Sequence, residues 1–373
     1  MEWKEVRLGD ILNFRRGHDL PHSAMKPGNI PVAGSNGVIG YHDTATPIKP
    51  ILTIGRSGNV GKPYFYEEAW AHNTTLYVDD FKGNDPKFLY YLCQTMPFAN
   101  FGGGSAVPTL NRNHIHPLET KIPVKVEDQR RIASILSSLD RKIELNNKIN
   151  ADLEEMAQAI FKNWFVDFEP FKDGKFVDSE LGMIPEGWKV GSPYEYVKVV
   201  YGAPYKSAKF NDNGEGLPLI RIRDLKDCNP QFYTPEILPQ TEYVNMGDIV
   251  AGMDAEFVPH IWKGNTGLLN QRVCKLMPQQ TSISNLFVLY LMKPELEFVQ
   301  SYKTGTTVSH LGKADIDKFV VVLPPLKVVE ECSKILDSIL QRIKNISAES
   351  RNLSTLRDTL LPRLMSGELE VPE

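Results

Sequence analysis

Two stretches of the chain place apolar residues at alternating steps of four and three positions. The spacing continues through 132–164 and through 336–364, with polar residues at a few of its positions. A spacing of this kind that continues for about four heptads predicts a long helix with one apolar stripe. We therefore predict two long helices, the first over 126–167 and the second over 326–366.

The stripe positions of the two helices are the candidates for packing one helix against the other. The apolar ones are Ile132, Leu136, Leu139, Ile143, Leu153, Ile160 and Trp164 in the first helix and Leu336, Ile339, Ile343, Leu353 and Leu360 in the second. Asn146 and Asn150 interrupt the first stripe, and polar residues at such positions cost stability but fix register. Because both stripes belong to one chain, we expect an antiparallel pair within the chain. A coiled coil between two copies of the chain is the alternative.

The segments outside the helices repeat each other. Trp3 opens the first and Trp188 opens the second, and the residues 104–107 recur as 305–308, 201 positions later. The chain therefore reads as globule, helix, linker, globule, helix and tail. The predicted boundaries are 1–125, 126–167, 168–187, 188–325, 326–366 and 367–373.

The interiors of the two globules, 15–100 and 201–300, share little beyond composition. One scaffold thus carries two different surfaces. A duplicated catalytic site would more often keep the same polar residues in both halves. A protein that recognises two different targets would instead keep the scaffold and vary the binding surface. If the target is DNA, two such globules at a fixed separation predict a split site, which is two short specific sequences with an unread gap between them. The two half-sites would lie about one helical turn apart.

Composition narrows the class of protein. Hydrophobic residues make up 42% and charged residues 24%, as in ordinary globular proteins, and the net charge is −4. The globules are less acidic than the connecting parts, because 1–125 carries +2 and 188–325 is neutral. This distribution is compatible with local basic faces. No apolar run is long enough to span a bilayer and no signal peptide is evident, so we expect a cytoplasmic protein without a membrane partner.

The usual signatures of catalysis and metal binding are incomplete. Residues 229–232 nearly match a methyltransferase motif but lack its second proline, and Gly61 and Lys62 lack the rest of a phosphate loop. His114 and His116 alternate as on one face of a strand, without a third metal ligand. The four widely spaced cysteines are expected to be buried thiols. We therefore predict no catalytic residue, no metal site and no cofactor in this chain.

Base readout favours arginine for guanine and asparagine for adenine, and phosphates favour lysine, arginine and hydroxyl groups. Side chains of these types cluster at two places in the first globule. They are Arg56, Ser57, Asn59 and Lys62 in a glycine-rich hairpin loop and Asn111, Arg112 and Asn113 further on. The alternative for the second cluster is structural, since asparagine also caps turns.

The second globule offers a different set of candidates. They are Lys206, Arg221, Arg223, Lys303, Thr306 and His310. Alternation predicts that Arg221 and Arg223 lie on one face of a strand. An internal salt bridge of Arg221 to Asp224 or Asp227 is the alternative.

Several short segments, in their order and spacing, carry a resemblance to a known family. They are Pro-Thr-Leu-Asn-Arg-Asn at 108–113, Glu-Asp-Gln-Arg-Arg-Ile-Ala at 127–133, Phe-Lys-Asn-Trp-Phe-Val-Asp-Phe-Glu-Pro-Phe at 161–171, the tryptophan-led 182–190 and Leu-Leu-Pro-Arg-Leu-Met-Ser-Gly-Glu at 360–368. Over essentially its full length the chain resembles the specificity (S) subunit of type I restriction–modification systems. One departure is that 326–331 lacks the Gln-Arg-Arg-Ile run of the first half, which could alter a partner contact.

The resemblance implies an α/β fold: two mixed α/β target-recognition domains in pseudo-twofold repeat, separated by two long helices that form an antiparallel coiled coil. It implies a non-catalytic subunit that reads a bipartite site on double-stranded DNA. The implied protein partners are two copies of a modification (methyltransferase) subunit, docked on the helices, and a restriction (translocase and nuclease) subunit. S-adenosylmethionine, ATP and Mg would then bind those partners rather than this chain.

Overall fold

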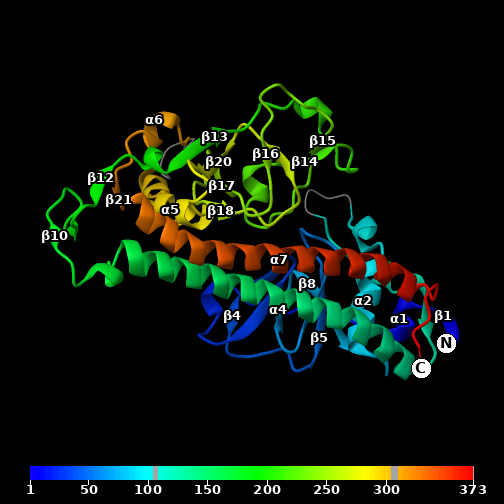
Figure 1. Ribbon diagram of the computed structural model, residues 1–373. Coiled ribbons are helices and arrows are strands. Elements are labelled where there is room, and N and C mark those ends of the chain that lie inside the picture. Colours follow the sequence, from blue (N-terminus) through cyan, green and yellow to red (C-terminus); the bar gives the residue numbers. More distant parts are fainter. Residues whose placement is uncertain (104–107, 304–309, 373) are drawn as a thin grey trace. The chain divides into compact units, whose positions relative to one another are not determined.

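The computed structural model describes residues 1–103, 108–303 and 310–372. The chain divides into two compact units, which we call the first unit (Met1–Ile143 with Asn352–Glu373) and the second unit (Glu144–Arg351). The long helices α4 (Val126–Phe165) and α7 (Leu326–Met365) each contribute to both units (Figure 1). Each unit therefore consists of one globule together with a stretch of each helix.

The described residues of the first unit form three small sheets. One pairs its two ends, β1 (Trp3–Arg7) with β9 (Glu119–Pro123). The four-stranded sheet has the order β2 (Asn13–Arg16), β8 (Thr75–Asp80), β5 (Ile51–Gly55), β6 (Pro63–Tyr66), and the three-stranded sheet has the order β4 (Gly37–His42), β3 (Ile30–Gly34), β7 (Trp70–Ala71). The short helices are α1 (Leu8–Ile11), α2 (Pro86–Thr95) and α3 (Arg112–Ile115).

The second unit repeats this arrangement after a small hairpin of β10 (Phe176–Val177) and β11 (Ile184–Pro185). Its ends pair through β12 (Lys189–Gly191) and β21 (Val321–Leu323). The four-stranded sheets have the orders β13 (Val197–Tyr201), β20 (Val273–Pro278), β17 (Ile249–Gly252), β18 (His260–Ile261) and β15 (Tyr233–Thr234), β14 (Leu217–Ile220), β19 (Gly267–Leu269), β16 (Tyr243–Val244). The helices are α5 (Asn285–Lys303) and α6 (Lys313–Ile316).

The two units share a topology as well as a composition. In each, a four-stranded antiparallel sheet lies next to a sheet with one parallel pair, β3 with β7 in the first unit and β14 with β19 in the second. Gly17 and Gly202 follow equivalent strands, and an added Cβ would stand 2.1 Å from the carbonyl oxygen of His72 or Asn270. The predicted fold class, two mixed α/β units built on two long helices, is confirmed.

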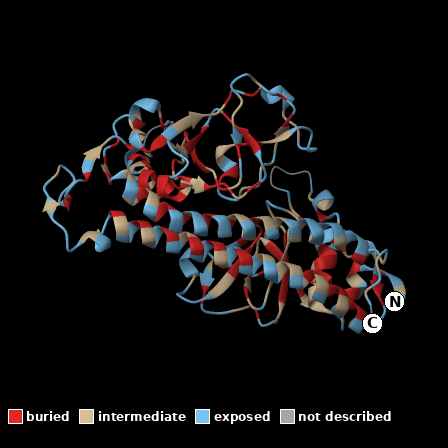
Figure 2. Cartoon of the chain, in the orientation of Figure 1, coloured by how far each residue is buried: buried red, intermediate tan, exposed pale blue. Residues whose placement is uncertain are grey.

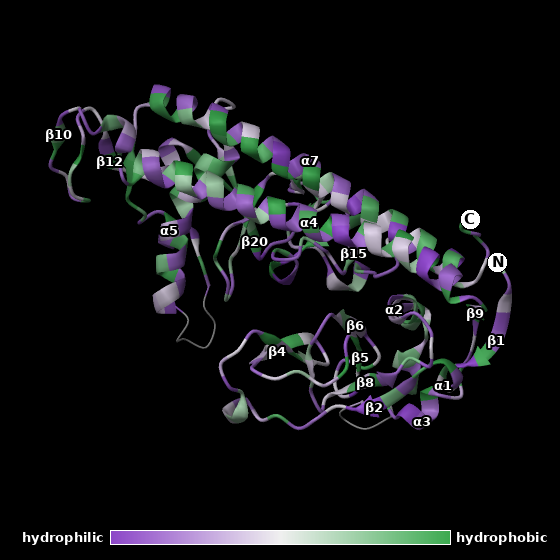
Figure 3. Ribbon diagram, turned by 90° about the horizontal axis from the view of Figure 1, so that it is seen from below, coloured by the Kyte–Doolittle hydropathy of each residue, from purple (hydrophilic) through white to green (hydrophobic). Residues whose placement is uncertain are grey.

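In the first unit the helices complete the core of the globule. Ile132 and Leu136 of α4 and Leu361 and Leu364 of α7 join one buried apolar cluster with strand and helix residues such as Phe14. Both long helices have buried positions among exposed ones (Figure 2). Apolar and polar residues alternate along each helix (Figure 3). Burial of the apolar stripe is what keeps helices of this length stable, since helical propensity alone contributes little.

In the second unit the two helices run antiparallel. Asn146 donates to Glu349 at 2.8 Å and Asn150 donates to Ser347 at 3.0 Å, so residue numbers rise on one helix as they fall on the other. The helix contacts thus form within one chain. Of the predicted stripe positions, the buried ones are Ile132, Leu136, Leu153, Leu336, Ile339 and Ile343, and the half-buried ones are Leu139, Ile143, Ile160, Trp164, Leu353 and Leu360.

Two further sequence expectations concern the thiols and membranes. All four cysteines are free, and all but the half-buried Cys228 are buried. Burial raises the pKa of the Cys274 thiol to about 12. In the part of the chain that the structure describes, no helix has the length and apolar character needed to cross a bilayer.

Candidate nucleic-acid interface

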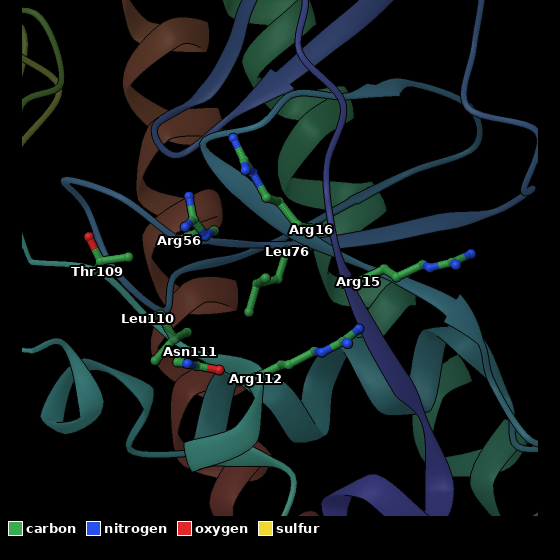
Figure 4. A pocket seen from close by; sticks show the side chains of 8 residues that line it. All are labelled: Arg15, Arg16, Arg56, Leu76, Thr109, Leu110, Asn111 and Arg112. Carbon is green, nitrogen blue, oxygen red and sulfur yellow. The ribbon is translucent and has the colours of Figure 1, made fainter.

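The first unit contains a cavity of about 420 Å³ whose rim is rich in arginine (Figure 4). Its lining residues are Arg15, Arg16, Arg56, Leu76, Thr109, Leu110, Asn111 and Arg112. None of them is acidic. The buried side chains of Leu76 and Leu110 are its apolar part.

Three separate segments bring the arginines together. Arg15 and Arg16 end β2 and leave it in different directions, as neighbouring strand residues do (Figure 4). Arg56 follows the last residue of β5, and Arg112 begins α3. The segments are joined by the backbone, since the N–H of Leu110 donates to the carbonyl of Arg56 at 2.8 Å.

Each arginine is held by a different neighbour. Arg15 pairs with Asp79 at 3.4 Å, and Arg16 pairs with Asp19 at 3.5 Å. Arg56 and Arg112 donate through Nη1 to backbone carbonyls instead: that of Asn73 at 3.4 Å for Arg56 and that of Phe14 at 3.2 Å for Arg112. The cavity therefore presents guanidinium groups with no carboxylate inside it, which suits phosphate oxygens and the acceptor edges of bases.

Arg56, Asn111 and Arg112 were predicted from the sequence, and the structure places all three in the cavity. Asn111 caps α3, because its Oδ1 accepts from the N–H of Asn113 at 3.0 Å. That is the structural role which the sequence left as the alternative. The side chain of Asn113 is exposed.

The other candidates of the first unit lie on the β5–β6 loop outside the cavity. Ser57 is half-buried, and its carbonyl accepts from the hydroxyl of Ser35 at 2.6 Å. Asn59 and Lys62 are exposed, with the Lys62 ammonium 5.5 Å from the ring centre of Tyr64.

Sequence reasoning missed Arg15 and Arg16. The available signal was two consecutive basic residues directly before Gly17, at the end of a short strand. Arginines at the end of a strand stand next to loops, where binding residues concentrate.

The prediction that His114 and His116 share a strand face was wrong. Both lie at α3, because Asn111 caps a helical turn there. His116 Nε2 accepts from the N–H of Phe14 at 3.1 Å, which requires the unprotonated ring nitrogen. Burial lowers the pKa of His116, and the charge of Arg112 lowers it further.

The second unit has the same backbone arrangement with different side chains. The N–H of Leu311 donates to the carbonyl of Met253 at 2.7 Å, as Leu110 does to Arg56. Asp254 and His310 form the isolated antiparallel bridge that Ser57 and Thr109 form in the first unit. Met253 therefore stands where the first unit has Arg56, and it is buried.

A charged cluster surrounds this place in the second unit. Asp254 accepts from His310 Nδ1 at 2.8 Å and pairs with Arg272 at 3.3 Å. Lys303 donates to the His310 carbonyl at 2.9 Å and pairs with Asp315 at 2.7 Å. Of the predicted residues, Lys303 and His310 thus lie together, and Thr306 lies outside the described residues.

The predicted strand for Arg221 and Arg223 was also wrong. β14 ends at Ile220, and a 3₁₀ turn over Ile222–Asp224 follows. Arg221 pairs with Asp224 at 3.1 Å and lies over the ring of Phe232, so it makes the internal salt bridge that was the alternative.

Arg223 and Lys206 are exposed. The N–H of Lys206 donates to Glu236 at 2.9 Å, and Lys209 pairs with the same carboxylate at 2.9 Å. These two interactions lower the pKa of Glu236, the first more than the second. Among the residues that the structure describes, no group of three or more His, Cys, Asp or Glu side chains could hold a metal ion.

The same scaffold thus occurs twice, with an arginine-rich cavity in one copy and a different set of side chains in the other. This combination defines a recognition protein with two different binding units. Comparison with known proteins agrees with this class. The family described as the type I restriction modification DNA specificity domain matches residues 1–155 and 185–353. The chain therefore belongs to this family, whose members are the non-catalytic DNA-recognition components of type I restriction–modification systems.

Individual relatives extend the similarity over most of the chain. The specificity subunit of the type I restriction enzyme MjaIX from Methanocaldococcus jannaschii is 28% identical and covers 77% of this chain and 70% of its own. That of HindI from Haemophilus influenzae is 24% identical over 98% of this chain and 94% of its own. The crystal structure of the S subunit from M. genitalium shares the fold, with a TM-score of 0.58, 15% identity and coverage of 98% and 96%.

Proposed function

We propose that the chain reads a split site on double-stranded DNA, with one half recognised by each unit. The observation that carries the proposal is the divergence between equivalent positions of the two units. Arg56 in one corresponds to Met253 in the other, although the backbone hydrogen bonds around them are the same. A protein that needs two different half-sites requires this combination of a constant scaffold and a variable surface.

We further propose that the helices dock two modification (methyltransferase) subunits and that a restriction (translocase and nuclease) subunit joins them. Large apolar side chains on the helices support partner docking. Leu145 and Met156 on α4 are 52% and 53% exposed, and Leu356 on α7 is 46% exposed. Leu145 and Met156 are eleven positions apart, about three turns of a helix, so they lie on the same face of α4, as expected for a docking surface. Under this proposal, S-adenosylmethionine, ATP and Mg bind the partner subunits.

The test is genome-wide sequencing of adenine methylation in a host that supplies the modification subunit, with and without this gene. We expect the gene to add one methylated motif with two specified halves and an unread gap. Exchange of residues 188–325 for those of a relative should change one half and leave the other intact. Assembly of the subunits without any new methylated motif would overturn the proposal in favour of an adaptor that binds only proteins.

A further inference from the structure

Arg56 and Arg112 differ from the other arginines of the cavity in what holds them. Each donates one hydrogen bond from Nη1 to a backbone carbonyl. Within 1–103, 108–303 and 310–372, neither makes an ion pair. A single contact to a fixed carbonyl orients a guanidinium and leaves its remaining N–H groups for a ligand. Such preorganisation reduces the entropic cost of binding.

Arg15 and Arg16 are held more loosely. Their side chains are 61% and 56% exposed and lie 3.4 and 3.5 Å from carboxylates. Exposed ion pairs contribute little and rearrange readily, whereas a backbone carbonyl is fixed by the fold. These two arginines therefore suit phosphates, which can be contacted from many directions.

The geometry of a guanidinium matches one base edge better than the others. Its parallel N–H groups donate to the O6 and N7 acceptors of guanine, whereas adenine places an amino donor beside its N7. Cytosine presents an amino donor in the major groove, and the cavity lining has no carboxylate to accept from it. The buried Leu76 and Leu110 exclude water on one side, which strengthens hydrogen bonds formed there.

The second unit lacks this arrangement. Met253 stands in place of Arg56, and Lys313, which begins α6 as Arg112 begins α3, pairs with Asp317 at 2.7 Å. Gly17 and Gly202 directly follow equivalent strands, so the residues before them correspond to each other. Tyr201 of the second unit therefore stands where the first unit has Arg16. Within the described residues, the first unit alone thus has arginines without an ion pair at these two equivalent positions.

We propose that the first unit reads a guanine in its half of the split site, with Arg56 and Arg112 as the donors to the O6 and N7 edge of that base. The second unit reads its half by other chemistry. This inference rests on the proposed function, and it adds which base the first unit selects and which residues select it.

The test uses the full chain assembled with its modification subunits and duplexes that carry the methylated motif. The half that persists when residues 188–325 are exchanged belongs to the first unit. Each guanine in that half is replaced singly by 7-deazaguanine, which pairs normally but lacks the N7 acceptor. We expect one replacement to weaken binding by roughly 10- to 100-fold, because the guanidinium then loses its charged hydrogen bond to N7 and keeps only the one to O6.

Arg56→Lys separates base readout from charge. Lysine keeps the positive charge but offers guanine a single ammonium in place of the fork, so this variant should discriminate less between natural and 7-deazaguanine duplexes than the unmodified protein, while its binding to random DNA is unchanged. Arg112→Lys should behave in the same way. Lys49→Ala is the matched control, because it removes a positive charge before the opposite end of β5 and should keep the full preference for guanine.

The outcomes separate the two proposals. A first-unit half-site without guanine, or one in which no 7-deazaguanine weakens binding, overturns this inference and leaves the reading of a split site intact. Retention of the full guanine preference by both lysine variants also overturns it. Absence of any split motif overturns the proposed function and this inference with it.

Discussion

The side-chain amide of Asn150 on α4 donates a hydrogen bond to the hydroxyl of Ser347 on α7, and both residues are buried in the second unit. The same hydroxyl donates to the carbonyl of Ile343 at 2.7 Å. The amide oxygen of Asn150 has no partner among the described residues. The pair therefore fixes which turn of α4 faces which turn of α7, and it does so at a cost in stability.

Replacement of Asn150 by leucine should stabilise the second unit. Ser347 keeps its acceptor at Ile343, and the new side chain adds apolar burial next to Leu153. We expect the free energy of unfolding to rise by about 1 kcal/mol in chemical denaturation. Asn150→Asp should lower it, because a carboxylate would be buried there. A loss of stability in Asn150→Leu would show that the amide is a net stabiliser.

Asp140 joins the helices to the globule of the first unit. It accepts from Arg357 at 2.8 Å and from the Tyr91 hydroxyl at 2.5 Å. Burial raises the pKa of Tyr91, and the bond to Asp140 raises it further, so the hydroxyl stays a neutral donor. Asp140→Ala leaves two half-buried or buried donors without this acceptor. We expect it to lower the free energy of unfolding by about 1–3 kcal/mol in chemical denaturation.

Asp358→Ala is the control for this prediction. Asp358 also pairs with Arg357 at 2.8 Å, but its side chain is 64% exposed. Its loss should change the free energy of unfolding by less than about 0.5 kcal/mol. Equal effects of the two substitutions would contradict the idea that the half-buried acceptor, rather than the charge, supports the helix contact.

The helices could be predicted because their period is long and uninterrupted. The first was expected over 126–167 and spans Val126–Phe165, and the second was expected over 326–366 and spans Leu326–Met365. The division of the molecule could not be predicted in the same way. Its two units divide inside both helices, because each globule buries apolar side chains of α4 and α7 in its own core.

The errors concern residues whose role depends on which group their side chain, or that of a neighbour, hydrogen-bonds. Arg221 was expected on a strand, but Asp224 closes a turn there and binds its side chain. Gln129 belongs to the Gln-Arg-Arg-Ile run that the second half lacks, a departure that could alter a partner contact and stays a prediction. It is buried in the first unit, where it accepts from the N–H of Asp85 at 2.9 Å and so holds the start of α2. Sequence pattern alone does not show which way such a side chain points.

Arg16→Ala tests the assignment of this residue to phosphate contact. If Arg16 neutralises one phosphate, the variant should lose affinity equally on the methylated motif and on random DNA. The slope of log K against log salt should fall by about 0.9 in magnitude, the value for one phosphate contact. Fluorescence anisotropy with the assembled complex over a salt series measures both quantities. A loss confined to the motif would make Arg16 a base contact, and Lys49→Ala should leave the slope unchanged.

His116 should make the first unit sensitive to acid. Its pKa in the folded chain lies below the usual 6.5, because the ring is partly buried beside Arg112. As the pH falls through about 6.5, the unfolded chain takes up a proton that the folded chain does not, so the free energy of unfolding falls; above that pH this contribution is constant.

His116→Gln keeps an acceptor for the N–H of Phe14 but cannot titrate. Its urea midpoint should therefore fall less between about pH 7.5 and about pH 5.5 than that of the unmodified protein. His114→Gln is the control, because it makes the same substitution at an exposed histidine two positions away. Parallel pH profiles for His116→Gln and the unmodified protein would show that the ring nitrogen of His116 binds its proton equally in the folded and unfolded chain.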